Sequence, residues 1–142
     1  MVDVLKLEDI RKTFFQGRTS LVVLNKANLK IQDGEMVGLI GPSGSGKSTL
    51  LQIAGLLENA EEGRVSILGV PMNKLDDNSR TKARGTDIGF VYQYHHLLSE
   101  FTALENIVLP QLISGKSKTQ AKILANKLLA SMHLSDRSTH RP

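Results

Sequence analysis

Hydrophobic positions in the first part of the chain follow a pattern typical of β-strands. β-branched and aliphatic residues dominate Val4–Phe15 and Leu21–Ile31, which predicts two strands joined by a loop around Gly17. Met36–Ile40 is a continuous apolar run, as expected of a strand that is buried on both faces. The sequence therefore predicts a β-rich beginning followed by a buried strand.

The middle of the chain mixes helical and extended patterns. Ser48–Asn59 carries its apolar residues on one face and predicts a helix. Val65–Leu68 and Ile88–Tyr92 are short apolar runs that predict strands. The segment between them, Val70–Thr86, is polar and is predicted to be irregular.

Two helices are predicted near the end of the chain, each from a capping box. Thr102–Leu112 opens with Thr102 and Glu105 in this pattern, and Pro110 is expected to end or kink the helix. Ser117–Gln120 repeats the pattern and begins a second helix. Its apolar residues recur at helical spacing: Ala121, Leu124, Ala125, Leu128, Leu129 and Met132. This stripe must pack on another element, whereas the polar Ser135–Pro142 is predicted to be loop.

Composition narrows the class of protein. At 142 residues and 40% hydrophobic content, the chain suits one globular domain or part of one. It contains no cysteine, which excludes disulfide scaffolds and thiolate metal sites. No apolar stretch approaches the 18 or so residues of a membrane span. The first residues do not predict a secretion signal, so the expected compartment is the cytoplasm.

The net charge of +4 is unevenly distributed. Residues 1–115 hold 12 basic and 13 acidic side chains, whereas residues 116–142 hold six basic side chains and one acidic. A nucleic-acid-binding P-loop protein is one reading of this basic tail. The aromatic content of 4% and the helical spacing of the lysines favour a solvated helix face instead. We therefore expect no nucleic-acid partner.

One glycine-rich stretch carries a specific chemistry. It matches the phosphate-binding P-loop pattern G-x-x-x-x-G-K-[ST], with the residues Gly41, Pro42, Ser43, Gly44, Ser45, Gly46, Lys47, Ser48 and Thr49. Glycines let successive backbone N–H groups point at phosphate oxygens, and the N-terminus of the following helix favours the same anion. Lys47 is expected to reach the β- and γ-phosphates, and the Ser48 hydroxyl to ligate Mg²⁺. A chance glycine-rich turn is the alternative, but it would lack the strand before and the amphipathic helix after.

With its surroundings, this loop resembles the Walker A segment of the ATP-binding cassette (ABC) ATPases. The resemblance implies that Phe14, 33 residues before Lys47, stacks on adenine. Phe14 could instead be an ordinary strand aromatic. Ile88–Gln93 resembles the strand that leads into the family's Q-loop. This implies that Gln93 touches Mg²⁺ or the attacking water and links the ATP site to a transmembrane partner; otherwise Gln93 is a polar residue that closes a strand.

Tyr94–Asn106 resembles the lipoprotein-releasing ATPases of the LolD type. That resemblance implies an ATP-binding subunit, peripheral on the cytoplasmic face of the bacterial inner membrane, that drives lipoprotein release. Its partners would be transmembrane permease subunits and a second copy of the ATPase subunit, with lipoprotein as indirect cargo. Related ABC systems of the macrolide-efflux and cell-division types share much of this pattern and remain alternatives.

The paired His95 and His96 could suggest a metal site. Adjacent residues on an extended segment point in opposite directions, and no third ligand is evident. A metal held by these two residues is therefore not expected.

The predicted fold class is α/β, an incomplete P-loop NTPase fold of the ABC ATPase type. We expect residues 1–93 to form an antiparallel β subdomain and the P-loop core, and residues 94–142 to begin the helical subdomain. No segment resembles the family's signature motif, Walker B strand, D-loop or switch histidine. These residues are thus expected to be the first part of a longer ATPase. By themselves they are expected to bind ATP and Mg²⁺ without hydrolysing the ATP. A non-catalytic fragment that occupies the membrane partner is the alternative.

Overall fold

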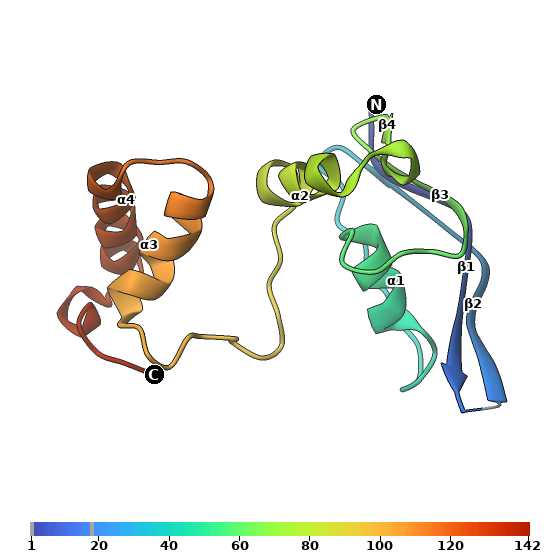
Figure 1. Cartoon of the computed structure of the whole chain (residues 1–142), viewed down its shortest axis with the longest axis horizontal. Helices are drawn as coiled ribbons and strands as arrows, with labels where there is room; N and C mark the ends of the chain where they lie inside the picture. The colour runs from blue at the N-terminus through green and yellow to red at the C-terminus, as the bar shows by residue number, and fades with distance from the viewer. Residues whose placement is uncertain (1, 18) are drawn as a thin grey trace. The chain divides into compact units, whose positions relative to one another are not determined.

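A computed structural model describes residues 2–17 and 19–142, which divide into two compact units (Figure 1). The first unit extends to Phe90 and holds a sheet and short helices, and the second spans Val91–Pro142 and is helical. Among the described residues, no helix has the length and apolar character that crossing a bilayer requires.

The sheet of the first unit is antiparallel and has the strand order β2-β1-β3-β4. Its strands are β1 Asp3–Gln16, β2 Thr19–Gln32, β3 Glu62–Ile67 and β4 Val70–Pro71. β1 pairs with β2 through a long register that runs from Asp3 opposite Gln32 to Gln16 opposite Thr19. The two strands predicted at the start of the chain are confirmed, and so is the short strand predicted at Val65–Leu68.

An irregularity in β1 determines what the sheet buries. Leu7 and Ile10 are three residues apart and would face opposite sides of a regular strand. The pairing shifts register between them, and Asp9 has a φ of 49°, so both side chains enter the core. They pack there with Ile53 of helix α1 (Lys47–Ala54), whose side chain is fully buried. The core of this unit therefore holds α1 against β1.

Helix α1 ends five residues earlier than the pattern predicts. Gly55 caps it, and Leu56 follows with a φ of 61°, outside the helical region. The ring of Phe90 lies directly against Gly55, so a side chain at position 55 would clash with it. The helix therefore ends where Leu56 leaves the helical region, and the Phe90 contact requires a glycine at position 55.

The segment predicted to be irregular contains a helix. A single turn, η1 (Met72–Lys74), is followed by α2 (Asp77–Thr86), and the Asp76 side chain accepts a hydrogen bond from the Ser79 N–H at 3.0 Å. The helix has little apolar character, and only Ala83 is buried. A hydrophobic periodicity could not reveal it, because its clearest local signal is the cap.

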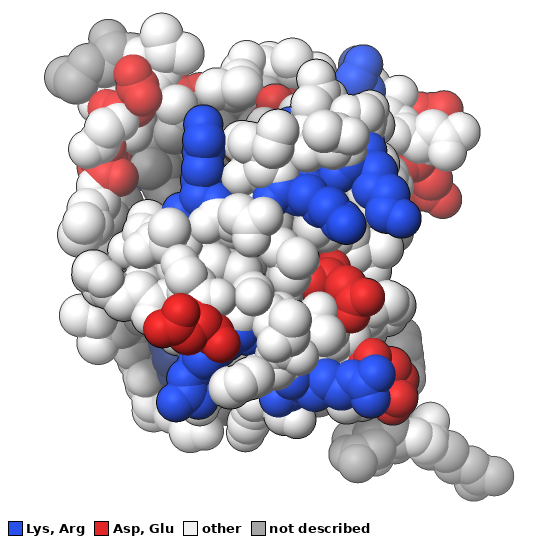
Figure 2. Space-filling model, turned by 90° about the vertical axis from the view of Figure 1, so that its left-hand side faces the viewer, with Lys and Arg blue, Asp and Glu red and all other residues white. Residues whose placement is uncertain are grey.

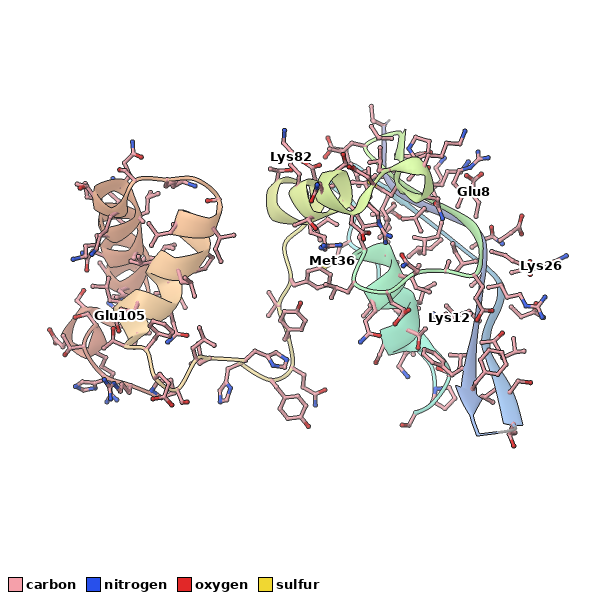
Figure 3. The ribbon with its side chains drawn as sticks, viewed as in Figure 1. Glu8, Lys12, Lys26, Met36, Lys82 and Glu105 are labelled. Carbon is pink, nitrogen blue, oxygen red and sulfur yellow. The ribbon has the colours of Figure 1, made fainter. Side chains whose placement is uncertain are left out.

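Two predicted strands are wrong. Neither Met36–Ile40 nor Ile88–Tyr92 is in a strand, and the Met36 and Ile40 side chains are 98% and 94% exposed (Met36 is labelled in Figure 3). Apolar content favours burial, but a strand also needs a neighbour that satisfies its N–H and C=O groups. In the part of the chain that the structure describes, neither segment joins the sheet.

The second unit is a pair of packed helices, α3 (Ala103–Ile113) and α4 (Lys118–Ser131). Both predicted capping boxes are present, and α4 buries Ala121 and Ala125 completely. α3 does not end at Pro110, since the Pro110 carbonyl still accepts from the Ser114 N–H at 3.0 Å. The stripe on α4 is only partly covered. A short turn, η2 (Ser135–Arg137), interrupts the predicted final loop.

Candidate functional site

The glycine-rich loop leads directly into the N-terminus of α1. Gly46 precedes the helix with a φ of 88°, and Gly44 has a φ of 79°. Glycine adopts this left-handed conformation without the steric cost that other residues carry. The first helical bond joins the Leu50 N–H to the Gly46 carbonyl at 2.9 Å. The amides that precede Leu50 in the first turn therefore have no acceptor within the helix.

No side chain caps this end of α1, and its first turn contains no acidic residue. The helix dipole places roughly half a positive charge here. The turn begins with Lys47, Ser48 and Thr49, which add an ammonium group and two hydroxyls. Amide donors, positive potential and hydroxyl oxygens together fit a phosphate and the Mg²⁺ that accompanies it.

The Lys47 side chain folds back over the loop. Its ammonium donates to the carbonyl oxygens of Pro42 at 2.6 Å and Gly41 at 2.9 Å, and it lies 3.5 Å from the Ser45 hydroxyl. These bonds hold the charge beside the curled backbone. A phosphate in the loop would offer the ammonium oxygen acceptors that carry a full negative charge, which form stronger hydrogen bonds than carbonyls do.

A hollow of about 570 Å³ opens beside this loop. Its walls come from the loop, α1, β1 and β2: Phe14, Val23, Ser43, Gly44, Gly46, Lys47, Ser48 and Thr49. The volume falls within the usual range of small-molecule sites. The structure thus brings Phe14 to the same hollow as the phosphate loop, while Gly41 and Pro42 contribute carbonyls to Lys47. The roles of these residues remain predictions.

Phe14 stands on β1 and its side chain is 41% exposed. The Lys12 ammonium lies 5.3 Å from the centroid of its ring, within the range of a cation–π contact. The same ammonium donates to the Glu58 carboxylate at 2.7 Å and to the Asn59 carbonyl at 3.0 Å. The aromatic wall of the hollow is therefore joined through Lys12 to the segment that follows α1 (Lys12 is labelled in Figure 3).

The hydrogen bond from Lys12 holds the pKa of Glu58 below its ordinary value. Partial burial opposes this shift, and the Asn59 N–H and the charge of Lys12 add to it. Glu58 is consequently a carboxylate at neutral pH, and its contact with Lys12 is an ion pair.

A second hollow, of about 270 Å³, involves residues after α1 rather than the phosphate loop. Glu58, Arg80 and Met72 are among its lining residues, and none of the loop residues is. The loop hollow is therefore the better candidate for a nucleotide site.

Gln93 belongs to the second unit, and the structure does not relate it to the phosphate loop. It is exposed, in a stretch without helix or strand. The ring of nearby His96 meets that of Tyr92 edge-on at 5.1 Å. Across residues 2–17 and 19–142, no three histidine, aspartate or glutamate side chains gather in a way that could hold a metal ion. The role of Gln93 remains a prediction.

The sequence did not identify Val23, which lines the hollow, or the ion pair between Glu58 and Lys12, the lysine that contacts the Phe14 ring. Val23 is one apolar residue among several in β2, and only the fold brings it to the loop. Glu58 is 46 positions from Lys12, a separation that no local pattern spans. The available signal was the i, i+2 spacing of Lys12 and Phe14, which puts both on one face of a strand.

The basic residues near the end of the chain are exposed. Lys116, Lys118, Lys122 and Lys127 all face solvent, as the helical spacing predicts. On the face shown in Figure 2, basic side chains are interspersed with acidic and uncharged surface.

Residues 24–142 match the family model described as "ABC transporter". Three relatives carry the name lipoprotein-releasing system ATP-binding protein LolD. The protein of Paramagnetospirillum magneticum is 54% identical over 97% of this chain, that of Ruegeria sp. 53% over 97%, and that of Maricaulis maris 52% over 98%. The chain spans 61% of the length of each of them.

Two solved structures are similar to the chain over 97% of its length, each with a TM-score of 0.87 and 39% sequence identity. One is a dimeric bacterial ABC transporter cassette, and the other is a dimeric ATP-binding cassette in a post-hydrolysis state bound to ADP and Pi. The chain covers 61% of each.

Proposed function

The chain belongs to the ABC transporter family, and on that premise we propose that it is part of an ATP-binding subunit that drives lipoprotein release. The predicted family and fold class, a partial α/β domain of the ABC ATPase type, are confirmed. One observation supports ATP binding most directly: an uncapped helix N-terminus, a lysine and an exposed aromatic ring line one hollow.

We propose the following roles for these residues in binding Mg²⁺–ATP. The loop amides and Lys47 bind the phosphates, and the Ser48 hydroxyl is a ligand of Mg²⁺. Phe14 stacks on adenine, which supplies a binding contribution independent of charge. Gln93 contacts the metal or the attacking water in the assembled enzyme. Bound Mg²⁺ would neutralise charge that develops on the transferring phosphoryl group.

The partners we propose are transmembrane permease subunits and a second ATPase subunit, at the cytoplasmic face of a bacterial inner membrane. The relatives' printed name supports a lipoprotein-releasing system, and the titles of the similar structures support a dimer. Lipoprotein would be an indirect cargo that the membrane partner handles.

Residues 1–142 by themselves are proposed to bind nucleotide without turning it over. Hydrolysis of the γ-phosphate needs a group that orients or activates water. None of the residues that the structure places around the loop hollow is an aspartate or glutamate. Binding through the loop does not require such a carboxylate.

Two measurements test this function. Isothermal titration of the chain with Mg²⁺–ATP should show saturable binding, while phosphate release should stay at the buffer rate. Absence of binding by a folded chain, shown by circular dichroism, would contradict the nucleotide site. For the cargo, a full-length protein with this sequence and its permease partners would be placed in proteoliposomes. ATP-dependent transfer of a lipoprotein to a soluble acceptor is expected, and transfer of only another substrate class would overturn the assignment.

A further inference from the structure

We propose that Lys12 is a positioning residue for the nucleotide base: it holds the Phe14 ring so that one face stays open to adenine. The inference rests on the proposed function, since it presupposes that Phe14 stacks on adenine. Lys12 itself is not assigned a contact with ATP.

The first step is the contact between the two side chains. Lys12 and Phe14 are two positions apart on β1, and the contact between the ammonium and the ring shows that their side chains lie on the same face of the strand. The ammonium lies 5.3 Å from the ring centroid, over the ring. A cation over one face is attracted to the ring and restricts its rotation. A ring that is already ordered loses less conformational freedom when the base stacks on it.

The second step is that the ammonium is itself fixed. It donates to the Glu58 carboxylate at 2.7 Å and to the Asn59 carbonyl at 3.0 Å, and its side chain is only 14% exposed. The flanking backbone is tied to the same segment. The Glu61 N–H donates to the Arg11 carbonyl at 2.9 Å. A lysine anchored in this way cannot swing freely away from Phe14.

The third step links this anchor to the phosphate-binding helix. The N–H groups of Leu57 and Glu58 donate to the Gln52 carbonyl at 2.8 and 3.2 Å, and Gln52 lies in α1. The phosphate loop leads into the N-terminus of α1. Lys12 therefore ties the aromatic wall of the hollow to the element that would bind the phosphates. This connection would set the distance between the base platform and the phosphate site.

The competing explanation is that the Lys12–Glu58 ion pair is purely structural. A ligand with adenine and a ligand without it distinguish the two explanations. Binding of Mg²⁺–ATP and of Mg²⁺–tripolyphosphate, which has no base, would be measured on the whole chain. Lys12→Met should weaken ATP binding roughly 2- to 5-fold. Tripolyphosphate binding should stay within about 2-fold of wild type. Lys12→Arg should restore most of the loss, because a guanidinium can also lie over a ring. Equal weakening of both ligands would overturn the proposal.

A double-mutant cycle isolates the ring. In a Phe14→Ala background, Lys12→Met should have no further effect on ATP binding, and an undiminished effect there would overturn the proposal. Glu58→Gln, which keeps the lysine and weakens its anchor, should shift ATP affinity in the same direction by a smaller factor. That variant serves if Lys12→Met does not fold.

The control is Lys6→Met. Lys6 is on the same strand and pairs with Glu8, and it should leave both affinities unchanged. Failure of the underlying function has a different outcome. If Phe14→Ala itself binds ATP and tripolyphosphate as wild type does, adenine stacking is wrong. If the wild-type chain binds neither ATP nor tripolyphosphate, the assignment of the phosphate site is wrong.

Discussion

A methyl group placed on the α-carbon of Gly46 would lie 3.0 Å from the carbonyl oxygen of Val23. Gly46 is the residue from which α1 starts, and Val23 lies in β2. The absence of a side chain at this position lets the phosphate loop rest on the sheet. The loop's place therefore depends on backbone contact as well as on backbone conformation.

Gly46→Ala is expected to weaken both folding and nucleotide binding. The φ of 88° costs an L-residue about 1–2 kcal/mol, and contact with Val23 adds to that. Chemical denaturation and ATP titration would measure the two losses. Gly34→Ala is the matched control, because Gly34 has a φ of 74°, has open space around it and does not line the hollow. Gly46→Ala should be clearly more damaging than the control; equal losses would mean that the contact with Val23 is unimportant.

Lys47→Ala should abolish measurable triphosphate binding while leaving the fold intact. The ammonium supplies charge-assisted hydrogen bonds to phosphate, each worth about 1.5–3 kcal/mol. In the structure it bonds only to groups of its own loop, so its loss affects the loop alone. Titration with ATP, paired with a thermal melt, would check this. Lys127→Ala, on the exposed side of α4, should bind normally, and unchanged affinity of Lys47→Ala would refute the phosphate assignment.

Gln93 is expected to matter for turnover more than for binding. The prediction comes from resemblance to the Q-loop, and it concerns a full-length, assembled enzyme. Gln93→Ala in such a protein should lower partner-stimulated ATP hydrolysis at least about tenfold, because a group that orients metal or water acts mainly in the transition state. ATP affinity should change little. Comparable losses in affinity and in turnover would show that Gln93 is instead structural.

The parts of the molecule that the sequence predicts best depend on local signals. The capping boxes at Thr102 and Ser117 mark helix starts because donor and acceptor lie three residues apart. The phosphate loop is equally local, since its glycines and lysine act within nine residues. Its shape follows from the positive φ angles of Gly44 and Gly46, which glycine adopts without steric cost.

What the sequence could not reveal depends on partners distant in the chain. Met36–Ile40 has the composition of a buried strand, yet composition cannot say which segment would pair with it. The bond between Lys12 and Glu58 spans 46 positions and needs the sheet and α1 to be packed first. Helix α2 is hard to predict for another reason: its residues are polar, and its clearest local signal is the cap at Asp76.

The capping box of α3 should make the second unit sensitive to acid. The Thr102 N–H and hydroxyl both donate to Glu105 at 2.8 Å, and they hold the pKa of that carboxyl below its ordinary value. A carboxyl whose pKa is lower when folded stabilises the fold above its unfolded pKa. That contribution is lost as the pH falls through the folded pKa. Stability should therefore decline from about pH 5 downward.

Glu105→Gln tests this prediction, because glutamine keeps an oxygen acceptor for the Thr102 N–H but does not titrate in this range. Urea midpoints would be compared at about pH 7 and about pH 3. The variant should be less stable than wild type at neutral pH, and the gap should close in acid. Glu100→Gln, outside the capping box, is the control. A gap that persists unchanged in acid would contradict the assignment.

Asn106 connects the start of α3 to the loop before it. Its side-chain oxygen accepts from the Leu98 N–H at 2.9 Å, and its amide group donates to the carbonyls of Leu98, Phe101 and Thr102 at 3.0–3.1 Å. Asn106→Ala should lower the free energy of unfolding by about 1–3 kcal/mol, because these partners would lose their acceptor and donors together. Asn106→Asp should be no better, since it places a carboxylate against three carbonyl oxygens. Denaturation followed by circular dichroism would measure both variants. Asn126 is exposed on α4, so Asn126→Ala should be neutral or slightly stabilising and serves as the control. If Asn106→Ala is as stable as this control, other contacts hold the loop.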